Sequence, residues 1–203
     1  KMPNPQRVGV YGGAFDPPHR AHLNLAQTAI EQLELDLLHI IPTGSAWHKT
    51  RVLSPAEHRL AMTRLAFAPL ARTVVDAQET ERTGPSYTAD TLEALAGRYP
   101  GAQFFLLLGQ DQAQALPTWR RWPDVQRLAT ICVAQRAVES PVSNGFSPEN
   151  LSERGFVDIK LPRMPHSSTD IRARAASGQS LEPLVGQAVA RYIAKHKLYQ
   201  APA

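Results

Sequence analysis

Short apolar runs alternate with helix-like segments along the whole chain, and this alternation limits its possible folds more than any other feature. The runs QFFLLLG (103–109) and TICVA (130–134) are continuously apolar, which is typical of strands covered on both faces of a sheet. HLNLAQTAIEQLEL (22–35) instead spaces its apolar side chains three or four residues apart, as on one face of a helix. Strands that alternate with helices form crossover units, so the sequence predicts a mostly parallel sheet.

The full pattern predicts one α/β domain of Rossmann-like type, with helices on both faces of the sheet. The predicted strands cover 6–12, 37–42, 73–77, 103–109, 130–134 and 155–162. The predicted helices cover 22–35, 57–68, 86–100, 122–129, 167–178 and 181–197. We expect residues 1–203 to form a single domain, with a C-terminal helical segment, about 167–199, packed on it.

Composition excludes several classes of protein. The single cysteine, Cys132, rules out an internal disulfide framework, and its apolar surroundings predict a packed thiol. The net charge of +4 is mild, and no basic stripe with interleaved aromatic residues points to nucleic acid. No apolar run is long enough to span a bilayer, and no secretory signal opens the chain. We therefore expect a cytoplasmic protein with no membrane or nucleic-acid partner, and the sequence leaves homo-oligomerisation open.

The stretch GVYGGAFDPPHRAH (9–22) joins the first predicted strand to the first helix, where ligands bind in sheets of this type. Gly12 and Gly13 can take positive φ and let a phosphate or ribose approach the main chain. His19 and His22 fall at a helix N-terminus, where free N–H groups favour anions, and their spacing puts both on one side. A tight turn with two solvated histidines is the plainer interpretation, and half of a metal site is another, although no third soft ligand stands nearby.

A second segment, SSTDIRAR (167–174), opens another predicted helix with two serines, a threonine and Asp170. Its free N–H groups form a second candidate anion site, and Arg172 can give two parallel hydrogen bonds to phosphate oxygens. Taken alone, the segment is better explained as an ordinary capped helix that carries a surface arginine.

Together, GGAFDPPHRAH and SSTDIR resemble the paired signatures of the nucleotidyltransferase superfamily. Four further stretches, GPSYTADTL (84–92), LLGQD (107–111), LPTWRRW (116–122) and HKT (48–50), resemble the bacterial nicotinate-mononucleotide adenylyltransferases. The resemblance spans nearly the whole chain. It implies an enzyme that transfers the adenylyl group of ATP to nicotinate mononucleotide in NAD biosynthesis, with release of pyrophosphate.

The resemblance also implies roles for individual residues. His19 and His22 contact the triphosphate, and Arg172 holds the outgoing phosphates. The remaining expected ATP contacts are Gly12, Gly13, Ala14, Gly109, Asp111, Ser167, Ser168 and Thr169. Asp111 is expected at a ribose, with a plain helix cap as its alternative. Ala14 and Ala21 depart from the family pattern, which has Thr and Gly there, and the methyl of Ala21 lies where adenine is expected.

On the acceptor side, the resemblance implies that Trp119 stacks on the pyridine ring, with Tyr87 and Thr88 beside it. The main-chain N–H groups near these residues and Arg120 are expected to meet the carboxylate. His48 and Lys49 are candidates for the mononucleotide phosphate, although a solvated loop lysine explains Lys49 nearly as well. Trp47 and Trp122 are expected to pack in the core.

Magnesium is the expected cofactor, carried by the ATP phosphates, because the sequence offers no dense carboxylate cage and no residue is assigned as a metal ligand. Asp16 lies close enough to assist, but bonding within the FDPP turn explains it better. Other interpretations stay open: a pantetheine-phosphate adenylyltransferase, a cytidylyltransferase, a non-catalytic nucleotide-binding module, or a fragment of a class I aminoacyl-tRNA synthetase. The last would need a KMSKS-like loop, which the sequence lacks.

Overall fold

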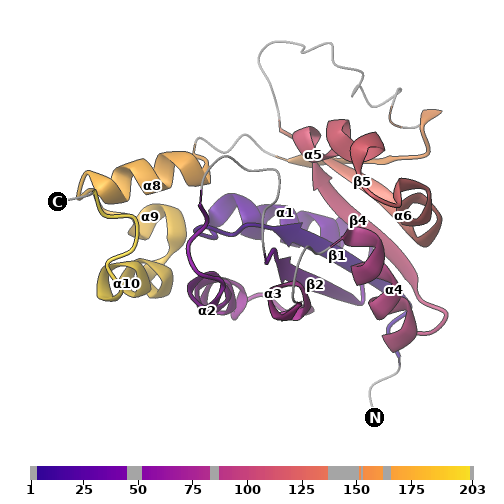
Figure 1. The fold of residues 1–203 in the computed structure, drawn as a ribbon, viewed down its shortest axis with the longest axis horizontal. Coiled ribbons are helices and arrows are strands. Elements are labelled where there is room, and N and C mark those ends of the chain that lie inside the picture. Colours follow the sequence, from indigo (N-terminus) through magenta and orange to yellow (C-terminus); the bar gives the residue numbers. More distant parts are fainter. Residues whose placement is uncertain are drawn as a thin grey trace.

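A computed structural model of the chain describes residues 4–44, 52–82, 87–136, 151, 153–161 and 166–201. Its centre is a six-stranded parallel sheet with the order β3-β2-β1-β4-β5-β6 (Figure 1). The strands are β1 (Arg7–Gly13), β2 (Leu37–Pro42), β3 (Thr73–Val75), β4 (Gln103–Gly109), β5 (Ala129–Arg136) and β6 (Val157–Leu161). This is the strand order of a doubly wound Rossmann-like sheet, so the predicted fold class is confirmed.

Helices connect the strands and continue beyond the last one. They are α1 (Arg20–Gln32), α2 (Ala56–Phe67), α3 (Gln78–Glu81), α4 (Thr88–Arg98), α5 (Gln110–Ala115), the 3-10 turn η1 (Leu116–Thr118), α6 (Trp122–Leu128), α8 (Ser168–Ala176), α9 (Glu182–Val185) and α10 (Gln187–Lys195). The sequence pattern does not predict α3, α5 or η1, because segments of three to six residues are too short to show a helical period.

The continuous apolar run in β4 is explained by burial on both faces of the sheet. Phe104, Leu106 and Leu108 join the apolar cluster formed with α4 and α6, whereas Phe105 and Leu107 join the cluster on the side of α1. Successive side chains of a strand point to opposite faces, so a strand covered on both sides needs no polar position. Each of these side chains is at most 5% exposed, and each buries enough surface to stabilise the fold by roughly 1.5–3 kcal/mol.

The C-terminal helices pack beside α2, at the end of the sheet where α1 begins (Figure 1). Val189 and Ile193 of α10 lie in the same buried cluster as Met62 and Phe67 of α2. The prediction of one closing helix over 181–197 is wrong. Gly186 takes a φ of 83°, which is accessible to glycine but strained for other residues, and it separates α9 from α10.

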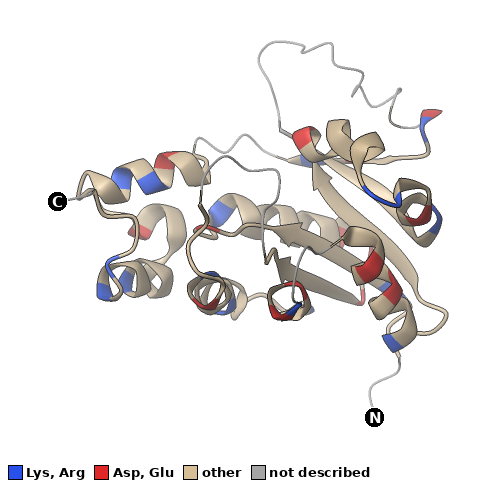
Figure 2. Cartoon of the chain, viewed as in Figure 1, with Lys and Arg blue, Asp and Glu red and all other residues tan. Residues whose placement is uncertain are grey.

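The described residues fit the expectations drawn from composition. Cys132 is fully buried in β5, and burial raises the pKa of its thiol to about 12. Figure 2 shows charged residues mainly on the helices, with acidic residues along α4 and basic residues on α8, while β2 and β4 carry no Lys, Arg, Asp or Glu. Within the described ranges, no helix is both long and apolar enough to cross a membrane.

Candidate active site

The turn between β1 and α1 lies at the carboxyl edge of the sheet, next to the end of β4. Tyr11 of β1 pairs with Leu107 of β4, and two residues further each strand ends at a glycine, Gly13 and Gly109. Strand order reverses at this pair, because β2 continues the sheet on one side and β5 on the other. Ligands in open α/β sheets bind in the crevice at such a switch point.

The backbone of this turn differs from the prediction. Neither Gly12 nor Gly13 has positive φ; the left-handed residue is Phe15, with φ 49°. Phe15 is buried, and its ring would lie 3.3 Å from a Cβ built on Gly13. A side chain at position 13 would therefore press on this ring, so Gly13 is favoured by close packing rather than by its φ. The Asp16–Pro17 peptide that follows is cis.

His19 and His22 are brought together at the start of α1, as their spacing predicts. His19 is the N-cap residue, and its Nδ1 accepts a hydrogen bond from the Ala21 N–H at 3.3 Å. The Nδ1 of His22 accepts from the His19 N–H at 3.0 Å. The ring centroids are 4.1 Å apart, and His19 is only 5% exposed. Since Nδ1 of each ring is an acceptor, each neutral imidazole carries its proton on Nε2 and can donate from there.

The start of α8 meets this turn, although the two segments are about 150 residues apart in sequence. Arg172 donates from Nη1 to the main-chain oxygen of Asp16 at 2.8 Å and from Nη2 to Thr169 Oγ1 at 3.1 Å. The Ser168 hydroxyl donates to the Pro17 main-chain oxygen at 3.2 Å. The two signature segments found in the sequence thus form one site.

The helix cap of α8 uses Ser167 and Asp170. Ser167 Oγ accepts from the Asp170 N–H at 3.2 Å, and the Asp170 carboxylate accepts from the Ser167 N–H at 3.2 Å. The Asp170 carboxylate accepts hydrogen bonds from the Ser167 N–H and the Ser167 hydroxyl, and both bonds lower its pKa. The ordinary capped helix considered for this segment is therefore present, and Ser168 and Arg172 contact the turn in addition to it.

At the end of β4, Gly109 caps the short helix α5 and Asp111 lies in its first turn. The Gly109 N–H donates to Gln112 Oε1 at 3.2 Å, and the Asp111 side chain is exposed. Asp111 is thus accessible at the switch point. It belongs to the first turn of α5, where the capping alternative also places it.

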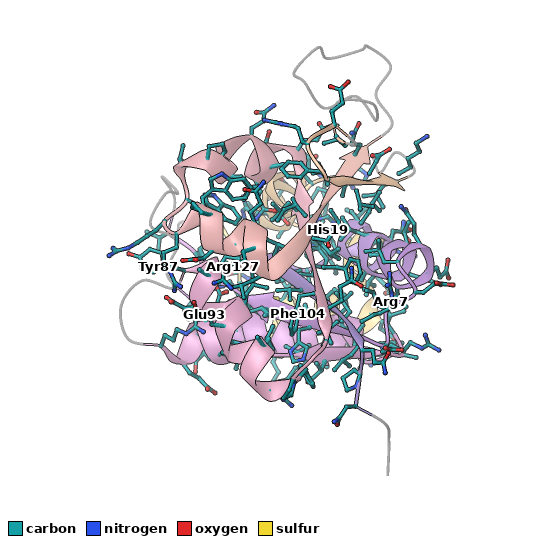
Figure 3. The ribbon with its side chains drawn as sticks, turned by 90° about the vertical axis from the view of Figure 1, so that its right-hand side faces the viewer. Arg7, His19, Tyr87, Glu93, Phe104 and Arg127 are labelled. Carbon is teal, nitrogen blue, oxygen red and sulfur yellow. The ribbon has the colours of Figure 1, made fainter. Side chains whose placement is uncertain are left out.

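Tyr87, Thr88, Trp119 and Arg120 form a second group, where α4 begins and where η1 joins α6. Tyr87 is the N-cap residue of α4, and the Arg120 guanidinium lies over its ring at 5.1 Å. Arg120 also donates to the Tyr87 hydroxyl at 3.4 Å. Trp119 is partly buried against the cluster of α4 and α6, and Trp122 packs there as predicted. Figure 3 shows Tyr87 and Glu93 on one flank of the molecule, with Phe104 inside.

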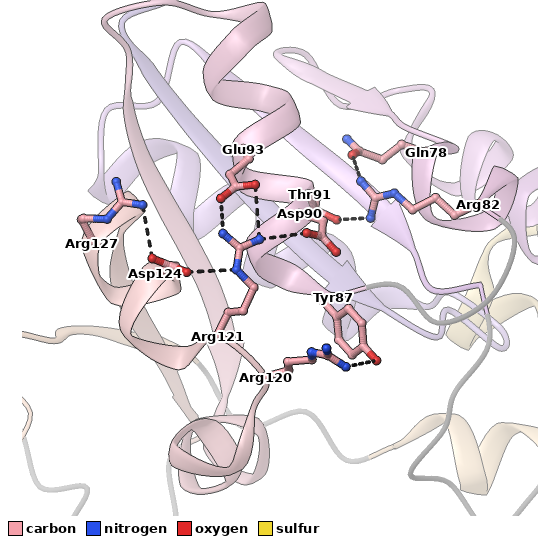
Figure 4. A network of polar contacts seen from close by, with 10 residues as sticks. All are labelled: Gln78, Arg82, Tyr87, Asp90, Thr91, Glu93, Arg120, Arg121, Asp124 and Arg127. Carbon is pink, nitrogen blue, oxygen red and sulfur yellow. Dashed lines mark hydrogen bonds and ion pairs between the residues drawn. The ribbon is translucent and has the colours of Figure 1, made fainter.

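Arg121, which sequence analysis does not single out, links α4 to α6 in this group (Figure 4). Its guanidinium bonds Asp90 at 2.9 Å and Glu93, both on α4, and Asp124 of α6 at 2.9 Å. Its φ of 60° is left-handed, a strained conformation for arginine. The hydrogen bond from Arg121 lowers the pKa of Glu93 and of Asp124. No sequence signal distinguishes Arg121 from its neighbour Arg120.

Arg59 of α2 is a second residue that the sequence does not reveal. It is 1% exposed, and its guanidinium donates to four main-chain carbonyls, one in the β1–α1 turn and three in the connection between β2 and α2. The acceptors are the oxygens of Ser54 at 2.8 Å, Ala14 at 3.2 Å, Thr43 at 2.5 Å and Gly44 at 3.1 Å. Arginine presents several donors in a fixed fork, which suits it to hold loop carbonyls in place. It therefore fixes the β1–α1 turn relative to the end of β2.

Two of the predicted acceptor contacts, His48 and Lys49, lie outside the described residues, as does Trp47. The described residues also offer no group of three or more His, Cys, Asp or Glu side chains that could hold a metal ion. The Asp16 carboxylate accepts from the Ser54 N–H at 2.9 Å and from the Tyr199 hydroxyl. Both partners lie outside the FDPP turn, so these bonds of Asp16 hold distant segments to the turn, and bonding within the turn stays a prediction. The described side chains therefore fit a magnesium ion carried by substrate oxygens better than a protein-built cage.

This chain is similar to a known protein family and to several named proteins. A family model described as cytidylyltransferase-like matches residues 10–174. A protein of Albidiferax ferrireducens named "Probable nicotinate-nucleotide adenylyltransferase" is 53% identical over 96% of this chain and 98% of its own length. A Methylibium petroleiphilum protein of the same name is 44% identical over 97% and 94%.

Solved structures show the same fold at low sequence identity. Plasmodium falciparum nicotinic acid mononucleotide adenylyltransferase, solved in complex with NaAD, is 18% identical and has a TM-score of 0.73. The match covers 96% of this chain and 97% of the other. With the matched family model and these near-full-length relatives, the chain belongs to the cytidylyltransferase-like family and, within it, to the nicotinate-nucleotide adenylyltransferases.

Proposed function

We propose that this chain transfers the adenylyl group of ATP to nicotinate mononucleotide, giving nicotinate adenine dinucleotide and pyrophosphate. A phosphate oxygen of the mononucleotide attacks the α-phosphorus of ATP, and the bond from that phosphorus to the bridging oxygen of pyrophosphate breaks. The enzyme needs no covalent intermediate for this step. Its contribution is to position both substrates and to stabilise the charge that moves onto the leaving group.

The observation that carries the proposal is the contact between the β1–α1 turn and the start of α8. It gathers two imidazoles, one guanidinium and the N-terminal end of α1 at the switch point of the sheet. Donors of this kind suit a triphosphate, because they point fixed N–H groups at developing negative charge. In the proposed complex, His19 and His22 donate from Nε2 to the triphosphate, and Arg172 to the outgoing phosphates.

The other ATP contacts in the proposal follow the two strand ends. Gly12, Gly13 and Ala14 line the triphosphate with main chain, and Gly109 and Asp111 lie at the end of β4, with Asp111 bonded to a ribose. Ser167, Ser168 and Thr169 form the helix end that receives the phosphates. Magnesium accompanies ATP and offsets phosphate charge when bound.

For the acceptor, Trp119 stacks on the pyridine ring and the main-chain N–H groups near Tyr87, Thr88 and Arg120 meet its carboxylate. His48 and Lys49 meet the mononucleotide phosphate. An indole offers a large apolar face to a flat ring, and the partly buried position of Trp119 keeps it oriented.

Pyrophosphate release with ATP, Mg²⁺ and a panel of acceptors tests the proposal. The panel is nicotinate mononucleotide, its amide counterpart, pantetheine phosphate and a no-acceptor control. We expect release with nicotinate mononucleotide and formation of the dinucleotide in equal amount. The proposal would be contradicted if pyrophosphate were released only with pantetheine phosphate, or if none of the acceptors in the panel gave release.

A further inference from the structure

The end of the chain reaches back to the turn that carries the two histidines. After α10, Lys197 and Tyr199 both take left-handed φ values, 54° and 61°, which turn the chain sharply. Leu198 donates its N–H to the Ile193 oxygen at 3.1 Å, which closes this turn on α10. The Tyr199 hydroxyl then donates to Asp16 Oδ1, across a sequence separation of 183 residues.

Asp16 is well placed to transmit this contact to the site. It is 1% exposed, it directly follows the left-handed Phe15, and it lies three residues before His19. Its Oδ2 accepts from the Ser54 N–H at 2.9 Å, and its main-chain oxygen accepts from Arg172 at 2.8 Å. Ser54 and Tyr199 hold the Asp16 carboxylate, and Arg172 holds its main-chain oxygen. Together these bonds fix the peptide between Asp16 and Pro17. Hydrogen bonds to a charged acceptor are about twice as strong as neutral ones, so the tyrosine contact is a strong part of this arrangement.

We propose that Tyr199 is a positioning residue for adenylyl transfer: its hydroxyl holds the Asp16 carboxylate and thereby the turn that sets His19 and His22 against the triphosphate. The proposal rests on the proposed function for the reaction that the histidines serve. Burial and the hydrogen bond with Asp16 raise the pKa of Tyr199, so the phenol remains a donor over the working range of pH. Misplacing catalytic groups by about 1 Å can cost about 100-fold in rate.

Tyr192 provides a matched control on the same C-terminal segment. Its hydroxyl shares a hydrogen bond of 2.7 Å with His58 Nδ1 of α2 and so holds α10 without touching the turn. Tyr192→Phe and Tyr199→Phe each remove a tyrosine hydroxyl that bonds the C-terminal segment to the rest of the domain. Only Tyr199→Phe removes a bond to the residue that precedes the prolines of the turn.

The experiment measures kcat and KM by pyrophosphate release, well below the unfolding midpoint of each variant. Tyr199→Phe should lower kcat about tenfold. The KM for nicotinate mononucleotide should stay within about twofold, because the residues proposed to bind the mononucleotide are unchanged. Tyr192→Phe should leave kcat within about twofold of wild type. In an Asp16→Ala background, adding Tyr199→Phe should change kcat by less than about twofold, because the carboxylate that accepts from the tyrosine hydroxyl is already absent.

The proposal is overturned if Tyr199→Phe keeps wild-type kcat, or if Tyr192→Phe loses as much, since either result leaves only general docking of the segment. A second measurement does not depend on the substrates: the ring-nitrogen resonances of His19 and His22. These should shift in Tyr199→Phe and not in Tyr192→Phe. If the wild type releases no pyrophosphate with nicotinate mononucleotide, the proposed function fails, while the histidine resonances still decide whether Tyr199 positions the turn.

Discussion

The imidazoles of His19 and His22 owe their tautomers to main-chain N–H groups of their own helix. Because each Nδ1 accepts from a neighbouring N–H, the proton of each neutral ring sits on Nε2. The same two bonds satisfy orphan donors at the start of α1, so capping uses one edge of each ring and leaves the opposite edge for the proposed phosphate contact.

His22→Ala should therefore lower kcat about 100-fold or more, because a donor to transition-state charge is lost. The loss of one helix-cap bond should cost only about 1 kcal/mol of stability. Steady-state kinetics measures the loss of kcat, and thermal unfolding measures the loss of stability. The control is His196→Ala, because His196 is exposed and follows α10. A His22→Ala rate within about threefold of wild type would rule out the phosphate role.

We expect ring stacking at Trp119 and charge at Arg120 to contribute separately to the use of the acceptor. Both nicotinate and its amide carry a flat ring, so Trp119→Ala should reduce the use of both acceptors by similar factors. Arg120 lies on the Tyr87 ring and is exposed, so Arg120→Ala should lower the acid-to-amide preference only a few-fold, and less in high salt. Kinetics with both acceptors tests this: loss of the acid reaction alone in Trp119→Ala would refute stacking.

Between elements, Arg121 holds the beginning of α4 against the beginning of α6. Its carboxylate partners Asp90, Glu93 and Asp124 come from both helices, so one guanidinium links the two helix starts (Figure 4). These side chains are a third or more exposed, and single ion pairs of this kind contribute little. The geometry of the network matters more than its energy.

Arg121→Ala should raise the KM for nicotinate mononucleotide a few-fold and leave the KM for ATP unchanged, because the ATP site is built from other elements. The control is Arg127→Ala, since Arg127 bonds only Asp124 within this network. Acceptor titrations at fixed ATP measure both constants. Equal effects of the two substitutions would mean that α6 charge, and not the link to α4, is responsible.

The strands were predictable from sequence because apolar runs such as that of β4 are long and buried on both faces. The two site segments were also predictable, since each combines turn residues with a helix cap and with chemically distinctive side chains. The positions of Arg59 and Tyr199 were not predictable. A buried arginine on a helix and a tyrosine near position 200 have no local signature, because their partners are loop carbonyls and a carboxylate from other segments of the chain.

On the scale of the whole molecule, a set of hydrogen-bonded polar side chains links the edge of the sheet to the end of α4. Asp76, after β3, accepts from His39 Nδ1 at 2.9 Å and from the Gln78 N–H at 3.0 Å, while His39 Nε2 bonds the Tyr99 hydroxyl at 2.8 Å. Burial of Asp76 opposes its ionisation, but the hydrogen bonds from His39 and Gln78 outweigh this and lower the pKa from 3.8 to about 2.

The folded pKa of Asp76 is depressed, so its ionised form stabilises the fold above about pH 4, and this contribution is lost as pH falls towards 2. It amounts to about 2 kcal/mol. Urea unfolding at pH 6 and pH 2 should show the stability difference between wild type and Asp76→Asn shrinking by about this amount. The exposed Asp111→Asn is the control. A difference that does not change with pH would show that the ionisation of Asp76 does not contribute.

The hydrogen bond between Tyr199 and Asp16 also sets an order of events during synthesis. The ribosome adds about 5–20 residues per second, so Asp16 precedes its tyrosine partner, 183 residues later, by roughly 10–40 s. β1 is made before Asp16, and β2 and β4 are made within that interval, so these three neighbouring strands can pair before Tyr199 is added. A nascent chain can therefore hold these strands while the turn that carries His19 and His22 still lacks its contact with Tyr199, so the proposed site is completed after this part of the sheet.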